Sequence, residues 1–300
     1  MFTDLSAFPL TPLCDDEVDE VAYAGVVERL ASAGVNSITA LGSTGAAPFL
    51  TTDERRRVAR IALRHAGGIP VIIGVSALRT SQVIDLARDA ADAGAAGLLL
   101  APMSYQPLTD DDVFGLYDDL TAAVPLQVIV YDNPGTTHFQ FGDALYARVA
   151  RLPNIASIKI PGVPAEPDAG RVRIEEIRSA VPEWVTIGIS GDASAACGLN
   201  AGCDAWYSVI GGTLPVAALT ISRAARSGNA AAAVAESDRL QPLWDLFAEH
   251  GSFRVIAAIA EVGGLVKPNS IPLPLRGLDG PARDRVRQVV RALDLLPPES

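Results

Sequence analysis

Hydrophobic residues alternate along this chain between two patterns, from the N-terminus to about residue 210. Short apolar runs are typical of strands buried on both faces of a parallel sheet. Each run is followed by apolar residues spaced three and four apart, which is typical of an amphipathic helix. The runs predict strands at 7–13, 37–41, 71–75, 97–101, 127–131, 155–160, 185–189 and 205–210. Eight strand–helix units in this order predict a (β/α)8 TIM barrel.

The helical pattern predicts where the barrel ends and which elements come after it. A helix is expected over 17–33, and a capping box of Thr51 and Glu54 opens the next. After residue 212 the strands stop and only helical periodicities continue, with an extended connector near 268–274 and a last helix over 280–294. We therefore predict two parts, a barrel formed by 1–212 and a C-terminal helical region formed by 213–300 that packs on it as an appendage.

Composition and charge exclude several classes of protein. A chain of 300 residues with 49% hydrophobic residues can bury a large core. The net charge of -11 argues against a broad surface for nucleic acid or anionic membrane. No window is apolar enough to span a membrane, and Asp4 stands where a signal peptide would be basic. Three cysteines at irregular spacing fit neither a disulfide framework nor a zinc site. We expect a cytoplasmic protein without metal or cofactor.

One lysine stands out in the predicted sixth strand. The chain has 22 arginines and only two lysines, Lys159 and Lys267, and Lys159 lies between two isoleucines. Arginine stays protonated in proteins, whereas a buried lysine can lose its proton and act as a nucleophile. Lys267 lies just before Pro268, where a solvated ammonium at a helix end is the ordinary interpretation. Lys159 is therefore the candidate reactive amine.

Active sites of (β/α)8 barrels lie at the C-terminal ends of the strands. That rule selects Ser43, Thr44, Tyr131, Lys159, Gly191, Asp192 and Tyr207. Strands five and six are neighbours, so Tyr131 and Lys159 are expected to lie close together. We expect Lys159 to be in a dry place beside hydroxyl groups and away from carboxylates, which suits imine formation with a carbonyl substrate. A tyrosine hydroxyl held by a threonine hydroxyl can then transfer protons.

These residues together resemble a known family. Gly42-Ser43-Thr44-Gly45, Tyr131 with Pro134, Ser157-Ile158-Lys159 and Ser190-Gly191-Asp192 occur in the order and spacing of the dihydrodipicolinate synthase / N-acetylneuraminate lyase family. The resemblance covers nearly the whole chain, including the C-terminal helices. It implies a Schiff base between Lys159 and pyruvate or another 2-keto acid. It also implies that the protein is a homodimer or a homotetramer.

The same resemblance implies roles for the other residues. Tyr131 would transfer the proton, and Ser43 and Thr44 would hold the keto-acid carboxylate and orient the tyrosine. Backbone around Gly191 and the side chain of Tyr207 would line the pocket, with Asp192 beside them.

The chain departs from the family where a second substrate would bind. Ala46 replaces the usual glutamate, and Asp132 replaces the asparagine that usually follows the tyrosine. Synthases that use aspartate semialdehyde carry an arginine after the tyrosine motif, where this chain has Thr136. A tyrosine pair in the loop after strand four is replaced by Met103 and Ser104, with Tyr105 displaced by one.

A neutral or polyhydroxylated partner fits these departures, with hydroxyls against Thr136, Thr137 and Asp132. We therefore predict a lyase, aldolase or dehydratase acting on a 2-keto-3-deoxy sugar acid or a related 2-keto acid, with an aldehyde as the possible second reactant. Dihydrodipicolinate synthase proper and a non-catalytic keto-acid-binding protein are the alternatives.

Two other enzyme classes have weaker support. A metal-dependent aldolase needs His, Asp and Glu ligands at the strand ends, and of three histidines only His138 lies near that face. A phosphate-binding barrel would use glycine turns after strands seven and eight, and these are present without basic support.

Overall fold

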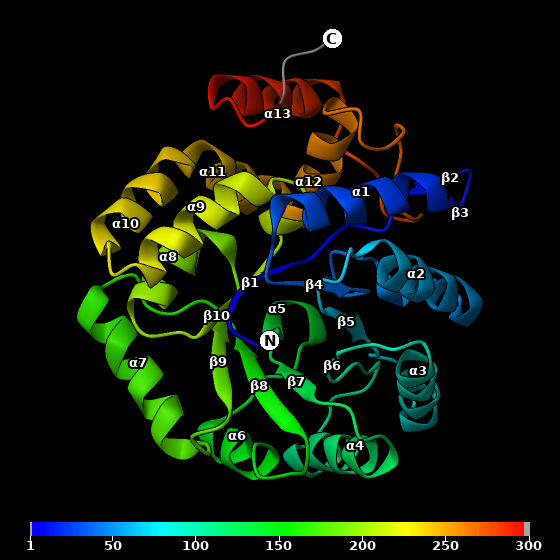
Figure 1. Cartoon of the computed structure of the whole chain (residues 1–300), viewed down its shortest axis with the longest axis vertical. Coiled ribbons are helices and arrows are strands. Elements are labelled where there is room, and N and C mark those ends of the chain that lie inside the picture. Colours follow the sequence, from blue (N-terminus) through cyan, green and yellow to red (C-terminus); the bar gives the residue numbers. More distant parts are fainter. Residues whose placement is uncertain (1, 297–300) are drawn as a thin grey trace.

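The computed structural model describes residues 2–296 and shows a closed barrel of parallel strands surrounded by helices (Figure 1). Around the barrel the strands follow the order β1-β10-β9-β8-β7-β6-β5-β4, and β4 pairs with β1 to close it. The barrel strands are β1 Asp4–Ala7, β4 Ser37–Ala40, β5 Val71–Gly74, β6 Gly97–Leu100, β7 Val128–Tyr131, β8 Ile155–Ile160, β9 Thr186–Ile189 and β10 Ala205–Ser208. The predicted fold class is confirmed.

Helices connect successive strands on the outside of the ring. They are α1 Glu20–Ala33, α2 Thr52–His65, α3 Thr80–Asp92, α4 Asp110–Ala123, α5 Pro134–Thr137, α6 Asp143–Val149, α7 Pro167–Ala180 and α8 Ala195–Asn200, with short 3-10 turns η1 Ala47–Phe49, η2 Asp192–Ser194 and η3 Ile210–Gly212. The predicted capping box of Thr51 and Glu54 is present at the start of α2. No helix in the described part of the chain is long and apolar enough to cross a membrane.

The first strand and first helix differ from the prediction. The strand expected at 7–13 is β1, which ends at Ala7. Pro9 and Pro12 follow it, and because proline has no N–H, this segment cannot continue the ladder. The helix expected from residue 17 begins at Glu20, behind the N-cap Asp19. Residues Leu13–Cys14 (β2) and Glu17–Val18 (β3) instead form a small antiparallel hairpin.

The C-terminal part is helical, as the sequence indicates. It contains α9 Pro215–Arg226, α10 Ala230–Arg239, α11 Gln241–His250, α12 Ser252–Val262 and α13 Gly280–Ala292. Helix α9 packs against α8, α1 and β1, so it occupies the eighth helix position around the barrel. The appendage predicted from residue 213 therefore includes one barrel helix. The remaining helices lie together on one side of the ring (Figure 1).

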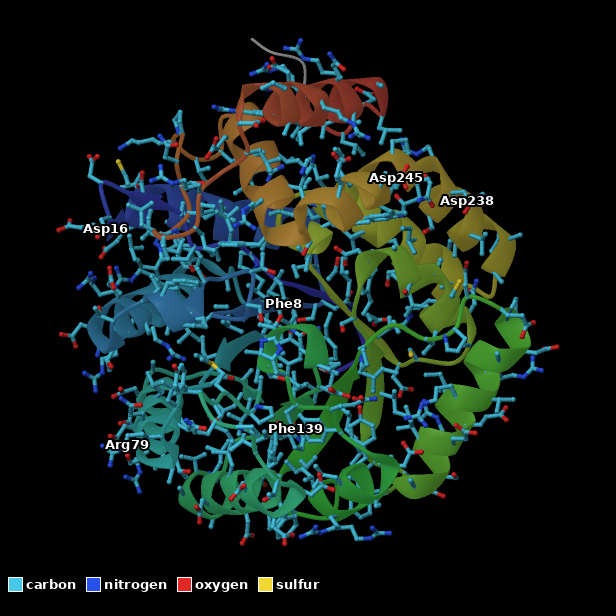
Figure 2. The ribbon with its side chains drawn as sticks, turned by 180° about the vertical axis from the view of Figure 1, so that it is seen from behind. Phe8, Asp16, Arg79, Phe139, Asp238 and Asp245 are labelled. Carbon is cyan, nitrogen blue, oxygen red and sulfur yellow. The ribbon has the colours of Figure 1, made fainter. Side chains whose placement is uncertain are left out.

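The space inside the barrel is filled by its own cluster of side chains. This cluster is Phe2, Phe8, Ile72, Leu99, Ala101, Ile129, Tyr131, Ala156, Ala205 and Tyr207. Phe8 lies near the middle of the molecule in Figure 2, whereas Asp16, Arg79 and Asp238 lie toward its edge. The ring of Phe8 packs edge-on against Tyr207, with centroids 6.1 Å apart. The interior is thus a packed apolar core that forms the floor of the space above it.

Candidate active site

A cavity of about 590 Å³ lies at the C-terminal ends of the strands. Eight of the residues predicted for the site line this cavity, whereas Asp132 and Thr137 do not. The eight are Ser43, Thr44, Tyr131, Thr136, Lys159, Gly191, Asp192 and Tyr207. The structure therefore brings together residues that are up to 164 positions apart in the sequence, from Ser43 to Tyr207. What each of them contacts decides what the site can do.

Lys159 lies near the end of β8, with Tyr131 of β7 and Gly188 of β9 opposite it in the parallel ladders. Its side chain is only 4% exposed, and its amine lies 4.2 Å from the centre of the Tyr131 ring. Burial lowers the pKa of Lys159 to about 7, and the charges of Asp192 and Asp132 act against this shift. A substantial fraction of the amine is therefore neutral, and nucleophilic, at neutral pH.

The expectation that Lys159 lies away from carboxylates is wrong. Asp192 and Asp132 are both close enough to raise its pKa against the effect of burial. Burial in turn raises the pKa of each of these carboxyl groups. The reactivity of the amine is thus set by desolvation that exceeds the attraction of two carboxylates.

The hydroxyl of Tyr131 is held by two side chains. Asn133 donates a hydrogen bond from Nδ2 to it at 2.8 Å, and Ser43 Oγ lies 3.4 Å from it. Since Asn133 supplies a hydrogen to this oxygen, the tyrosine hydrogen is free to point toward Ser43 or into the cavity. Burial raises the pKa of Tyr131, so the hydroxyl stays protonated and can donate. No hydrogen bond within residues 2–296 joins it to Thr44, so the predicted threonine support comes from Ser43 and Asn133 instead.

Asn133 was missed by the sequence analysis. It lies in the segment Asp132-Asn133-Pro134-Gly135, whose composition indicates only a turn, and it precedes the short helix α5. Its Nδ2 also donates to Thr136 Oγ1 at 3.0 Å, so one amide links the Tyr131 and Thr136 hydroxyls. Thr136 lines the cavity, and its hydroxyl accepts this hydrogen bond from Asn133.

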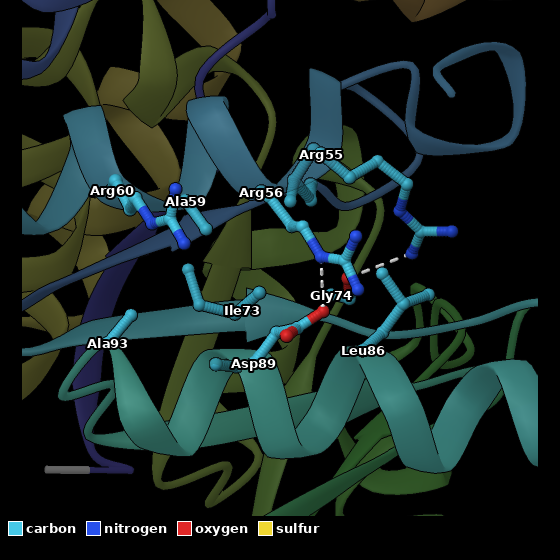
Figure 3. A pocket seen from close by; sticks show the side chains of 11 residues that line it. Arg55, Arg56, Ala59, Arg60, Ile73, Gly74, Leu86, Asp89 and Ala93 are labelled. Carbon is cyan, nitrogen blue, oxygen red and sulfur yellow. Dashed lines mark hydrogen bonds and ion pairs between the residues drawn. The ribbon is translucent and has the colours of Figure 1, made fainter. Parts of the chain in front are cut away.

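The loop that carries Ser43 and Thr44 is fixed by close backbone packing. Leu41 adopts a positive φ of 60°, and a Cβ on Gly74 would lie 1.9 Å from the Leu41 carbonyl oxygen. Only glycine fits at this contact between the ends of β4 and β5. Buried Arg55 of α2 donates to the Gly74 carbonyl at 3.1 Å (Figure 3) and to the Ser76 carbonyl at 3.0 Å. Helix α2 thus positions the end of β5, against which this loop packs.

Asp192 has a different role from the predicted one. Its buried carboxylate accepts hydrogen bonds from Trp206 Nε1, Ser208 Oγ and the amides of Val209 and Ile210, at 2.8–3.1 Å. With both oxygens engaged, the carboxylate anchors the turn after β10 and is not available for a substrate. Gly191 before it has a positive φ of 82° and lines the cavity.

Tyr207 and Asp132 are also engaged internally. The Tyr207 hydroxyl lies 2.6 Å from Ser157 Oγ, one layer below Lys159, and a Cβ on Gly188 would collide with the Tyr207 ring at 2.3 Å. Asp132 accepts a 2.5 Å hydrogen bond from Tyr146 and does not line the cavity. The predicted contact of Asp132 with a polyhydroxylated substrate is therefore wrong.

A second feature missed from the sequence is that the C-terminal helices form part of the site. Trp244, Phe247 and Ala248 of α11, and Ser252 and Phe253 of α12, line the same cavity. The helical pattern identified these helices, but helical periodicity does not indicate which neighbour they cover. In contrast, Tyr105 of the loop after β6 is 91% exposed and lies outside the cavity.

Residues 2–296 contain no group of three or more His, Cys, Asp or Glu side chains placed to hold a metal ion. His138 follows α5 in a left-handed conformation and is not among the residues that line the cavity. The polar side chains that line the cavity include one amine, several hydroxyls, one amide and one carboxylate.

Comparison with known proteins agrees with this geometry. The model of the dihydrodipicolinate synthetase family matches residues 1–293. A 4-hydroxy-tetrahydrodipicolinate synthase from Methylococcus capsulatus is 32% identical over 293 residues, covering 97% of each chain. A crystal structure of a dihydrodipicolinate synthase from Agrobacterium tumefaciens has 41% identity and a TM-score of 0.93, covering 97% of this chain and 98% of its own. The pyruvate complex of an Acinetobacter baumannii dihydrodipicolinate synthase has 26% identity and a TM-score of 0.88, covering 99% and 100%.

Proposed function

The chain belongs to the dihydrodipicolinate synthetase family and is a lyase of the Schiff-base type, and from this premise we propose that Lys159 forms an imine with pyruvate or another 2-keto acid. The observation that carries the proposal is the position of the Lys159 amine, buried above the Tyr131 ring with a pKa of about 7. At an ordinary pKa of about 10.4, roughly one lysine in 2,500 would be neutral at pH 7, whereas at about 7 roughly half are. The relative solved with pyruvate supports pyruvate as the donor.

In this proposal each side chain has a defined task. The neutral Lys159 amine attacks the keto carbon, and Tyr131 gives a proton to the oxygen that leaves as water. Loss of a proton from the carbon beside the imine gives an enamine, which reacts with an aldehyde or, in the cleavage direction, remains after the aldehyde departs. Ser43 and Thr44, on the fixed loop after β4, offer hydroxyl and backbone N–H groups to the keto-acid carboxylate.

The second reactant is proposed to lack a carboxylate at its far end. No arginine lines the cavity in the part of the chain that the structure describes, and Thr136 offers one neutral hydroxyl, which accepts a hydrogen bond from Asn133 and keeps its own hydrogen to donate. A neutral hydrogen bond contributes about 1 kcal/mol, compared with about 1.5–3 kcal/mol for a charged one. This supports a 2-keto-3-deoxy sugar acid or a related 2-keto acid as the substrate of a lyase, aldolase or dehydratase.

Synthesis of 4-hydroxy-tetrahydrodipicolinate is the second candidate, because the curated relatives carry that name. Supplying pyruvate with aspartate semialdehyde separates the two. A kcat/KM above about 10⁴ M⁻¹s⁻¹ for that pair, the low end for natural substrates, would favour the synthase over our proposal. A protein that binds pyruvate without turning over any aldehyde would instead be a non-catalytic keto-acid-binding member.

A homodimer or homotetramer in the cytoplasm remains part of the proposal. The free thiols Cys14, Cys197 and Cys203 are consistent with a reducing compartment. Light scattering coupled to size-exclusion chromatography measures the assembly directly, and a monomer at micromolar concentration would contradict it.

The test of the Schiff base uses pyruvate and borohydride. One reduced adduct is expected on the peptide that holds Lys159. Lys267 serves as an internal control, because its side chain is 66% exposed and paired with Asp19. The pKa of Lys267 is raised, mainly by its contact with the Cys14 sulfur and to a smaller extent by Asp19. An adduct on Lys267, or no adduct, would remove the proposed mechanism.

A further inference from the structure

One wall of the active-site cavity is aromatic. It is made by Phe49 of η1, by Trp244 and Phe247 of α11 and by Phe253 of α12. The chain has only 17 aromatic residues other than histidine, counted as 8 Phe, 6 Tyr and 3 Trp. Four of them line the cavity from η1, α11 and α12, in addition to Tyr131 and Tyr207 from the barrel strands.

These aromatic side chains present carbon, not hydrogen-bonding groups, to the cavity. The indole N–H of Trp244 is used within the protein, because it donates to the Ser237 carbonyl at 2.9 Å. Trp244 and Phe247 pack against each other with centroids 5.7 Å apart. Phe49 is 44% exposed although it lines a cavity. A ligand that covers this large apolar side chain removes it from water, which stabilises the complex.

Two polar side chains that line the cavity, Asp192 and Ser190, are engaged within the protein. The Asp192 carboxylate accepts from the amides of the turn after β10, and Ser190 Oγ donates to the Ile160 carbonyl at 2.7 Å. Lys159 is the only cation that lines the cavity within residues 2–296, and it lies on the barrel side near Tyr131. The cavity therefore has a polar end that suits a keto acid and an apolar end with no charged partner for a carboxylate.

We propose that the group carried by the far end of the substrate is aromatic, so that the enzyme cleaves or forms a 4-aryl-4-hydroxy-2-oxobutanoate. This rests on the proposed function. Among uncharged far ends, it selects an aryl ring over a polyhydroxylated chain, since polyols require several hydrogen-bond partners and, beside its aromatic rings, α12 brings only the Ser252 hydroxyl to the cavity. Aromatic rings stack favourably edge-on or offset against Phe and Trp side chains.

The reaction balances with the residues described. In cleavage, Lys159 forms an imine with the C2 carbonyl and releases one water. Tyr131 has by then given its own proton to the C2 oxygen that leaves as water, so its phenolate takes the proton of the C4 hydroxyl as the C3–C4 bond breaks, giving the aryl aldehyde and an enamine on Lys159. The enamine is protonated at C3, and one water hydrolyses the imine to pyruvate. The net change is one hydroxy-oxo acid into pyruvate and one aldehyde, and no oxidant is needed. The volume of about 590 Å³ lies within the usual range of about 300–1,000 Å³ for small-molecule sites.

The experiment measures pyruvate release from three probes that differ only at the far end. They are 4-hydroxy-2-oxo-4-phenylbutanoate, 2-keto-3-deoxygluconate and 4-hydroxy-2-oxoglutarate. We expect kcat/KM for the phenyl compound to exceed the other two by at least about 10-fold, the low end of what a well-placed apolar contact gives. Equal or higher kcat/KM for the sugar acid or the dicarboxylate would overturn the proposal.

Variants of the wall make the test specific. Phe247→Ala is expected to lower kcat/KM for the phenyl compound by about 10–100-fold while changing the sugar acid by less than about 3-fold. Phe253→Ala provides a second variant should Phe247→Ala unfold, and Trp184→Ala, which removes an aromatic side chain 71% exposed outside the cavity, is the matched control. An equal loss for all three probes would mean that the wall is only structural.

Failure of this inference differs from failure of the proposed function. If borohydride traps pyruvate on Lys159 but the phenyl compound is not preferred, only the aromatic specificity is wrong. If no adduct forms on Lys159, the Schiff-base function itself is wrong, whatever the ranking of the three probes.

Discussion

The Tyr131 hydroxyl accepts a hydrogen bond from Asn133, lies within reach of Ser43 and is buried beside the Lys159 amine. Because Asn133 fills one lone pair, the hydroxyl has a defined direction in which to give and take its own proton. A positioned general acid–base group typically contributes a factor of about 10²–10⁴ to the rate. Its burial also keeps it protonated at neutral pH.

We therefore predict that Tyr131→Phe lowers kcat by about 10²–10⁴ with little change in thermal stability, because only a hydroxyl is removed. Steady-state kinetics and thermal unfolding measure both effects. Tyr117→Phe is the control, since it deletes a buried hydroxyl that donates to the Leu100 carbonyl away from the cavity. Unchanged kcat in Tyr131→Phe would mean that protons travel by another route.

At this scale the sequence predicts residues whose position depends on strand order. Lys159 and Tyr131 are at neighbouring strand ends, so barrel topology alone brings them together. Asn133 could not be found in this way, because its role depends on the direction of one amide across a turn. Asp192 was placed among the pocket residues by its position after a strand, and the sequence does not show that its carboxylate accepts four hydrogen bonds from the protein.

Single helices also contribute to the site through contacts with strand ends. Arg55 of α2 is buried, burial lowers the pKa of its guanidinium to about 10, and it donates to the carbonyls of Gly74 and Ser76. Gly74 in turn packs on the Leu41 carbonyl, two residues before Ser43. Arg56 next to it serves a different purpose, because it pairs with Asp89 of α3 and ties two helices together (Figure 3).

We predict that Arg55→Met destabilises the protein by about 2–4 kcal/mol, because two buried carbonyls lose their donor. We also expect a several-fold rise in the pyruvate concentration needed for half-maximal borohydride trapping, through movement of the loop that carries Ser43. Urea unfolding and titrated trapping measure the two effects. Arg60→Met, which changes an exposed arginine on the same helix, should alter neither. A stability loss without any change in trapping would show that Arg55 does not position this loop.

At the scale of elements, capping and proline account for which boundaries were predictable. The capping boxes at Thr51 and Thr109 set the starts of α2 and α4 by local hydrogen bonds, and the residue types that form them can be recognised in the sequence. The start of α1 was misplaced, because Glu17 and Val18 pair with Leu13 and Cys14 across a turn in which Asp15 and Asp16 have positive φ. Nonlocal pairing overrode a helical periodicity there.

The whole molecule combines a barrel that supplies the reacting groups with C-terminal helices that close part of the cavity. The alternating pattern predicts the barrel because every strand is buried on both faces. The place of α11 and α12 over the cavity could not be predicted, since an amphipathic helix records that one face is covered but not by which neighbour. The aromatic wall, and the specificity that we propose from it, could therefore be recognised only in the folded structure.

The buried amine also has a consequence for global stability. Lys159 has an ordinary pKa of about 10.4 when unfolded and a pKa of about 7 when folded. Between these values the unfolded chain binds one more proton than the folded chain, so this group makes stability rise with pH from about 7 to about 10. Below about pH 7 both states are protonated, and the full cost of burying the charge is present.

Lys159→Met should therefore stabilise the protein while abolishing Schiff-base formation. The expected gain in the free energy of unfolding is on the order of 4 kcal/mol at pH 7 and about 2 kcal/mol at pH 9. It is smaller at pH 9 because the lysine of the unfolded chain begins to lose its proton there, which lowers the cost of burying Lys159. Urea unfolding of both proteins at the two pH values, at one protein concentration, measures the difference. Lys267→Met is the matched control, because the pKa of Lys267 is raised, which gives the opposite sign. A gain that is the same at pH 7 and pH 9, or a loss at both, would show that Lys159 is not held neutral by burial.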